Sequence, residues 1–271
     1  MTTKTITEGK LRIFDTIDAF ADCYAPRASA QSRSAWIGGM SGRDALNAAR
    51  NGHPASIAQS EEYLNKFESL SFQARKYITV DAIAGGAPNV GAHLAGSPLA
   101  MRRRQRIVNE FAPLTVFCDV VSSAGVSADY LKKRGAAVLA LVRMLGATRP
   151  VSLYVVGGMG AYTAFDNGFV MVKLPEVADL SRSAFMMAHP AAARGMLYTC
   201  CEILNPEVRG HWAFNDVNTY RRKALKLYAD AIGSNEADCL YMPPIFYGEE
   251  KIVPEIWLPE MLAKYGAATE V

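Results

Sequence analysis

Carboxylate and hydroxyl side chains gather in one short stretch that follows a strongly apolar run. The run Leu114–Cys118 predicts a buried strand, Asp119 ends it, and Ser122, Ser123 and Ser127 follow. Ligands of parallel α/β sheets bind beyond the carboxyl ends of the strands, where we expect this stretch to lie. Carboxylate and hydroxyl oxygens suit Mg²⁺ or Mn²⁺. Three interpretations are open: a metal site at Asp119 and Ser123, a metal-free binding surface, or a turn whose side chains only cap the next helix.

The elements around this stretch predict the fold class. A helix over residues 127–146 and a second apolar strand over 151–156 complete a β-α-β unit, and residues 169–174 predict a third strand. We therefore expect an α/β fold with a mostly parallel sheet of about four to six strands and helices on both faces. Residues 1–35 predict an N-terminal extension with a helical segment, and residues 36–271 predict a single α/β domain.

The order of strand, Asp-Ser loop, helix and strand over residues 114–156 resembles a von Willebrand factor A domain. The metal motif of that family is D-x-S-x-S, and Asp119 and Ser123 match its first and last positions. Val121 replaces the middle serine, so one metal ligand of the family is absent. The resemblance implies a degenerate site whose remaining ligands would come from later loops, where the candidates are Thr163 and Asp179.

A second resemblance is spread over residues 33–258. In order and spacing, several short motifs are similar to an uncharacterised family found in tailed phages and some actinobacteria. The motifs are Trp36-Ile37-Gly38-Gly39, Ala49-Arg50-Asn51-Gly52-His53-Pro54, Val90 to Pro98, Arg134 to Val142, and His189-Pro190 with Arg194. The family pattern more often has Trp-Pro where this chain has His53-Pro54. The resemblance implies a phage or mobile-element protein and implies no reaction.

Four arginines form the strongest basic cluster of the chain. Arg102, Arg103, Arg104 and Arg106 follow Ser97-Pro98, which can open a helix, so we expect them on one short helix. Such a cluster can bind nucleic-acid phosphates, because affinity grows with the number of cations presented together. Further basic residues on a later predicted helix could extend the patch: Arg221, Arg222, Lys223 and Lys226. The alternative is a solvated helix face paired with acids such as Glu110.

Composition limits the classes of partner and compartment that fit this chain. The chain has 29 basic and 26 acidic side chains, a net charge of +3, which is too small to indicate a nucleic-acid partner by itself. The five cysteines are scattered without C-x-x-C spacing, which fits a reducing compartment. No apolar run approaches the roughly 20 residues of a membrane span. We expect a protein of the bacterial host cytoplasm or of the virion.

No catalytic constellation stands out, so we expect a non-enzymatic protein without catalytic residues. Trp36 precedes Gly38-Gly39 and either wedges a loop onto the core or anchors a partner. Our first hypothesis is a protein-interaction module whose partner, another protein, contacts Trp36, Ser122 and Tyr162 near the Asp119 and Gly157 loops. The alternatives are a DNA- or RNA-binding protein that uses the arginine cluster, and a metal-dependent hydrolase centred on Asp119.

Overall fold

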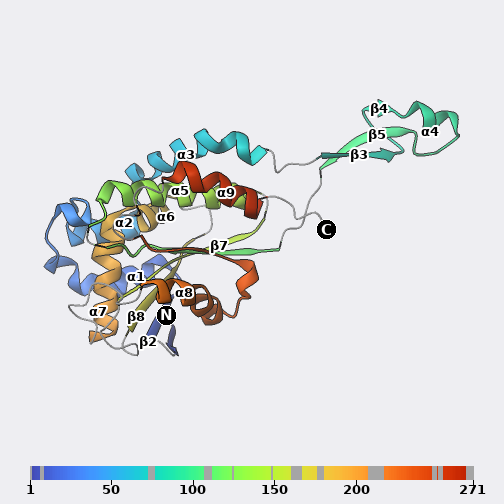
Figure 1. The fold of residues 1–271 in the computed structure, drawn as a ribbon. Coiled ribbons are helices and arrows are strands. Elements are labelled where there is room, and N and C mark those ends of the chain that lie inside the picture. The colour runs from blue at the N-terminus through green and yellow to red at the C-terminus, as the bar shows by residue number, and fades with distance from the viewer. Residues whose placement is uncertain are drawn as a thin grey trace.

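The chain folds into an α/β body from which a small β-structure extends (Figure 1). The computed structural model describes residues 2–6, 9–72, 77–106, 112–123, 125–147, 149–159, 167–175, 180–206, 217–245, 249 and 253–266. Inside some helices and strands the backbone alone is described.

The body is built on a six-stranded mixed sheet with the order β1-β2-β8-β7-β6-β9. The pairs β2/β8, β7/β6 and β6/β9 are parallel, whereas β1/β2 and β8/β7 are antiparallel. The mostly parallel α/β sheet predicted from the sequence is therefore confirmed. The strand bounds are β1 Thr2–Ile6, β2 Gly9–Phe14, β6 Leu114–Asp119, β7 Val151–Met159, β8 Asn167–Lys173 and β9 Cys239–Met242.

Helices pack against the sheet because its strands are apolar on both sides. Val116 and Cys118 of β6 join the core formed with Leu141 and other residues of α5. Phe117, one position along, faces Tyr228 of α8 in a second cluster. Figure 1 shows α3, α5 and α9 on one side of β7 and α8 on the other. The helix bounds are α1 Ile17–Tyr24, α2 Gly42–Asn51, α3 Pro54–Phe72, α5 Ala128–Gly146, α6 Leu180–Ala188, a π-helix Ala191–Leu197, α7 Tyr198–Leu204, α8 Val217–Ile232 and α9 Pro254–Gly266.

A second, three-stranded sheet lies apart from the body. Its order is β3-β5-β4, both pairs are antiparallel, and a short helix α4 follows β4. We call residues 77–106 the arm. Figure 1 shows the arm extending away from the helices that cover the main sheet. Its bounds are β3 Tyr77–Ala82, β4 Ala87–Pro88, α4 Val90–Leu94 and β5 Met101–Arg106.

Local sequence signals account for the well-predicted helices. Ser41 and Asp44 form the expected capping box, in which each side chain bonds the backbone N–H of the other residue. Ser127 caps α5 by accepting the backbone N–H of Tyr130 at 3.1 Å. The helix then runs to Gly146, as the apolar periodicity predicts.

Two expectations about local structure are wrong. Residues 9–14, expected in a helical extension, form β2, because Leu11 and Ile13 alternate toward α8 in the main sheet. Residues 101–106, expected in a helix, form β5 because they pair with β3 over its whole length. Residues 254–266 form α9 although Pro259 lies inside it, since Leu258 packs into the cluster that joins α3, α5 and α9.

Candidate functional site

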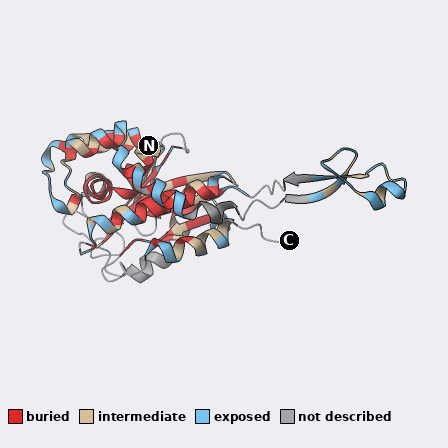
Figure 2. Cartoon of the chain, turned by 90° about the horizontal axis from the view of Figure 1, so that it is seen from above, coloured by how far each residue is buried: buried red, intermediate tan, exposed pale blue. Residues whose placement is uncertain are grey.

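The arm exposes an unusual amount of apolar surface. None of residues 79–103 is buried (Figure 2), and the arm contributes no residue to the buried clusters described for the body. Large apolar side chains point into solvent instead: Ile83 is 78% exposed, Val90 62%, Leu94 81% and Leu99 43%. Exposed large apolar side chains gathered on one small element are typical of contact sites in soluble proteins.

The predicted arginine cluster lies on the same arm, but on a strand. Arg102 and Arg103 are exposed, whereas the side chains of Arg104 and Arg106 lie outside the described residues. Side chains alternate along a strand, so positions 102, 104 and 106 share one face and position 103 lies on the other. Arg102 Nε is 4.0 Å from Asp81 Oδ1, an exposed contact of little energetic weight.

The arm carries the whole net charge of the chain. Residues 77–106 contain four arginines, no lysine and one acid, Asp81, which is a net charge of +3. The remaining residues therefore hold 25 basic and 25 acidic side chains. The arm thus combines apolar side chains with a positive charge that the rest of the chain does not share.

Asp119 ends β6 as predicted, between the strands β7 and β9. Its side chain is 0% exposed. Oδ1 accepts the backbone N–H of Val121 at 3.0 Å, and Oδ2 accepts the hydroxyl of Tyr241 at 3.0 Å. Arg134, which is also buried, donates from Nη1 to the Asp119 carbonyl at 3.0 Å.

These contacts fit the turn interpretation of the Asp119 loop better than a divalent cation site. Both carboxylate oxygens already accept hydrogen bonds, and among the described residues no group of three His, Cys, Asp or Glu side chains is arranged to hold a metal. Ser123 Oγ is buried without a hydrogen-bond partner. Thr163 and Asp179, the other candidate ligands, lie outside the described residues.

A buried arginine that the sequence analysis names only within the second resemblance, without assigning it a role, joins the predicted residues. Arg194, on the π-helix, is 3% exposed. It donates to the carbonyls of Trp36, Ser123 and Val126 at 3.1, 3.0 and 2.6 Å, and to Ser122 Oγ at 3.3 Å. Burial lowers the pKa of this guanidinium, yet the four acceptors hold it in place. The signal that could have found Arg194 is a lone charge in the apolar, alanine-rich run of residues 191–197.

Trp36 and Ser122 lie in this network rather than on a free surface. The Arg194 guanidinium lies 5.3 Å from the centre of the Trp36 ring, a cation–π geometry. Tyr198 donates its hydroxyl to the Ser122 carbonyl at 3.1 Å. The structure thus brings Trp36, Ser122 and Ser123 together around Arg194. Tyr162, the remaining predicted contact residue, lies outside the described residues.

His189 is buried at the junction after α6. Its Nδ1 accepts the backbone N–H of Ala191 at 3.1 Å, and its ring lies 5.2 Å from that of His53 and 5.4 Å from that of Phe185. Burial, followed by the charge effects of His53 and Lys132, lowers the pKa of His189 to about 4. This geometry is that of a structural histidine held in the neutral form.

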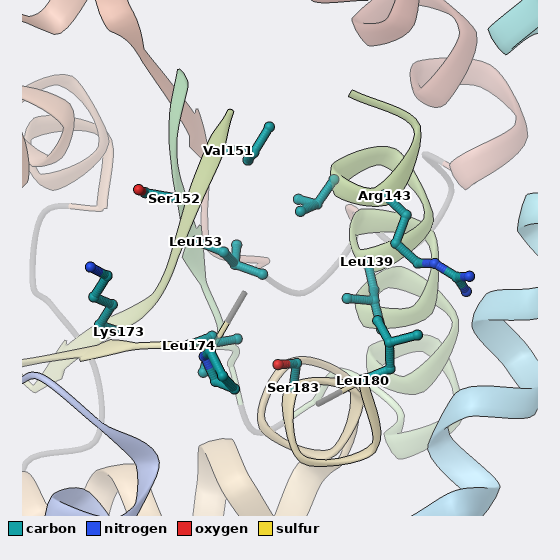
Figure 3. A pocket seen from close by; sticks show the side chains of 11 residues that line it. Leu139, Arg143, Val151, Ser152, Leu153, Lys173, Leu174, Leu180 and Ser183 are labelled. Atoms are coloured by element: carbon teal, nitrogen blue, oxygen red, sulfur yellow. The ribbon is translucent and has the colours of Figure 1, made fainter. Parts of the chain in front are cut away.

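Two cavities of different size lie in the body. One holds about 30 Å³ between α5, α6, β7 and β8, where Leu139 and Leu153 face the space (Figure 3). That is the volume of one water molecule, too little for a ligand. The other, between α1 and α7, holds about 250 Å³ and includes Cys23, whose pKa is lowered chiefly by a hydrogen bond with Cys200.

The model of the family described as Domain of unknown function (DUF7192) matches residues 4–266. The chain belongs to this family. The DUF7192 domain therefore includes the arm, the Arg194 network and α9. The chain matches no curated protein and no solved structure. Among the helices that the structure describes, none has the length and apolar character required to cross a membrane.

Proposed function

We propose that this DUF7192 protein is a non-enzymatic protein-interaction module, an accessory or structural component, whose contact element is the arm. The observation that carries the proposal is that residues 79–103 include no buried residue yet expose Ile83, Val90, Leu94 and Leu99. We also propose a phage origin, which rests on the sequence resemblance alone.

The energetics of the arm favour a partner. Ordering each residue costs about 1–2 kcal/mol in backbone entropy, and in most folds the burial of apolar side chains offsets this cost. A three-stranded sheet without a helix or second sheet on it buries little. Each exposed aliphatic side chain of the arm would contribute roughly 1.5–3 kcal/mol on full burial. Binding to an apolar partner surface supplies the burial that the arm lacks within its own chain.

The body supports the arm as a scaffold. Part of the docking surface predicted from the sequence is buried, since Asp119 and Ser122 are almost inaccessible and Gly157 lies within β7, whereas Gly125 is exposed. We also infer a degenerate von Willebrand factor A-like body. If β6, β7, β8 and β9 are numbered 1 to 4 along the chain, their order in the sheet is 3-2-1-4, an order found in doubly wound sheets. Asp119 then lies at the end of strand 1, where the strand order reverses.

Nucleic-acid binding is the second candidate. The exposed Arg102 and Arg103 and the net charge of the arm favour it. Phosphate binding through so few cations is weak at physiological salt, and it leaves Ile83 and Leu94 without a role. A protein partner would contact both the charged and the apolar side chains, so this candidate explains more of the arm's features than nucleic-acid binding does.

Photo-crosslinking from the arm tests the proposal. The chain is made with benzoylphenylalanine at Leu94 or, as a control, at Arg43, which is exposed on α2. After illumination in the cells that make the protein, we expect a discrete protein adduct from position 94 and none from position 43. A nuclease-sensitive adduct would support the nucleic-acid candidate instead. Equal adducts from both positions, or none from position 94, would overturn the proposal.

A further inference from the structure

Among the described residues, six large apolar side chains are exposed, and they fall in two places. Four lie on the arm, and the other two are Val253, 40% exposed, and Ile256, 58% exposed, at the start of α9. Both places are open to solvent in the part of the chain that the structure describes.

The start of α9 forms a small apolar patch with acidic neighbours. Leu258 is fully buried against α5, so the opposite side of α9 leaves Ile256 in solvent. Glu255 and Glu62 both lie near Tyr63, whose pKa is raised by burial and then by these two carboxylates. Glu260 follows Ile256 by four residues and so shares its helix face. We call Val253, Glu255, Ile256 and Glu260 the α9 patch.

We propose that the arm of one copy binds the α9 patch of a second copy of this chain. The inference rests on the proposed function and names its partner. Apolar side chains meet on both sides, and the positive arm faces a patch that contains Glu255 and Glu260. Glu255 is paired with Lys66 at 3.1 Å and also lies near Lys133, whereas Glu260 makes no ion pair among the described residues. Glu260 therefore adds orientation, and the aliphatic side chains add affinity.

The two surfaces differ, which determines the kind of assembly. Figure 1 shows the arm extended away from α3, α5 and α9, so it leaves the patch of its own chain uncovered. Contact between unlike surfaces is heterologous, and it builds either a closed ring or an open filament. Each copy uses its arm once and its patch once.

Mixing two variants tests this arrangement. The arm variant is Ile83→Ser with Leu94→Ser, and the patch variant is Val253→Ser with Ile256→Ser. All four side chains are exposed, so both variants should keep the thermal midpoint of the wild type. By light scattering, we expect the apparent mass of the wild type to exceed the 29.4 kDa of one chain and to rise with protein concentration. We expect each variant alone to associate on the order of 100-fold more weakly.

The mixture gives the decisive result. The arm variant keeps an intact patch and the patch variant keeps an intact arm, so an equimolar mixture should form a dimer of twice 29.4 kDa and nothing larger. A patch variant that associates like the wild type would overturn the inference, as would a wild type that stays monomeric. Both results are compatible with a Leu94 adduct to a different protein, in which case the proposed function stands and the second copy is excluded.

Discussion

Replacing Arg194 with methionine is expected to lower the free energy of unfolding by about 2–6 kcal/mol. Methionine retains much of the length of the side chain but provides no donor. The carbonyls of Trp36 and Val126 would lose Arg194 as a donor, whereas the Ser123 carbonyl still accepts the backbone N–H of Val126 at 3.1 Å. Each buried group left unsatisfied costs about 1–3 kcal/mol. Urea unfolding followed by circular dichroism measures the change.

An exposed arginine provides the matched control for this substitution. Arg50 donates to Asp22 at 2.5 Å, but both side chains are largely in solvent. Arg50→Met should change the free energy of unfolding by less than about 1 kcal/mol. If the two variants lose equal stability, the buried hydrogen bonds of Arg194 do not stabilise the fold more than an exposed ion pair does, which would contradict this prediction.

Acidification is expected to destabilise the protein through His189. Its pKa is about 4 in the folded chain, against about 6.5 when unfolded. Between these values the unfolded state binds the proton and the folded state does not, so stability falls as the pH falls from 6.5 toward 4. The loss from this residue is at most about 3 kcal/mol. Burial also lowers the pKa of His53, and this effect has the same sign.

His189→Asn isolates this contribution. The asparagine oxygen can accept the backbone N–H of Ala191 in place of Nδ1, and the amide does not titrate. We expect the variant to lose clearly less stability than the wild type between pH 6.5 and 4.5, measured by urea unfolding at each pH. His93→Asn, on the exposed helix α4, should follow the wild-type profile. A His189 variant with the full wild-type pH dependence would contradict the assignment.

Much of the body could be predicted because local signals and burial agree there. The capping box at Ser41, the cap at Ser127 and the apolar runs of β6 and β7 each determine structure within a few residues. The arm could not be predicted in this way. Residues 101–106 have no apolar period, and their strand conformation depends on pairing with β3, about twenty residues earlier.

The candidate site was predicted only in part, for a related reason. The position of Asp119 at the end of a strand follows from the apolar run before it, and this prediction is confirmed. The hydroxyl that donates a hydrogen bond to the Asp119 carboxylate belongs to Tyr241, 122 residues away, and no local pattern connects the two residues. The partner-binding roles predicted for Trp36, Ser122 and Tyr162, and the metal role predicted for Asp119 and Ser123, stay predictions.

Removing the arm tests the central claim most directly. Tyr77 and Arg106 are paired, so a Gly-Ser-Gly linker can replace residues 77–106 without straining the body. The mass in solution is then compared with that of the full chain over a range of concentrations. The account predicts that the full chain associates and that the shortened chain stays monomeric with an unchanged thermal midpoint. Equal association of both chains would contradict the claim that the arm is the contact element.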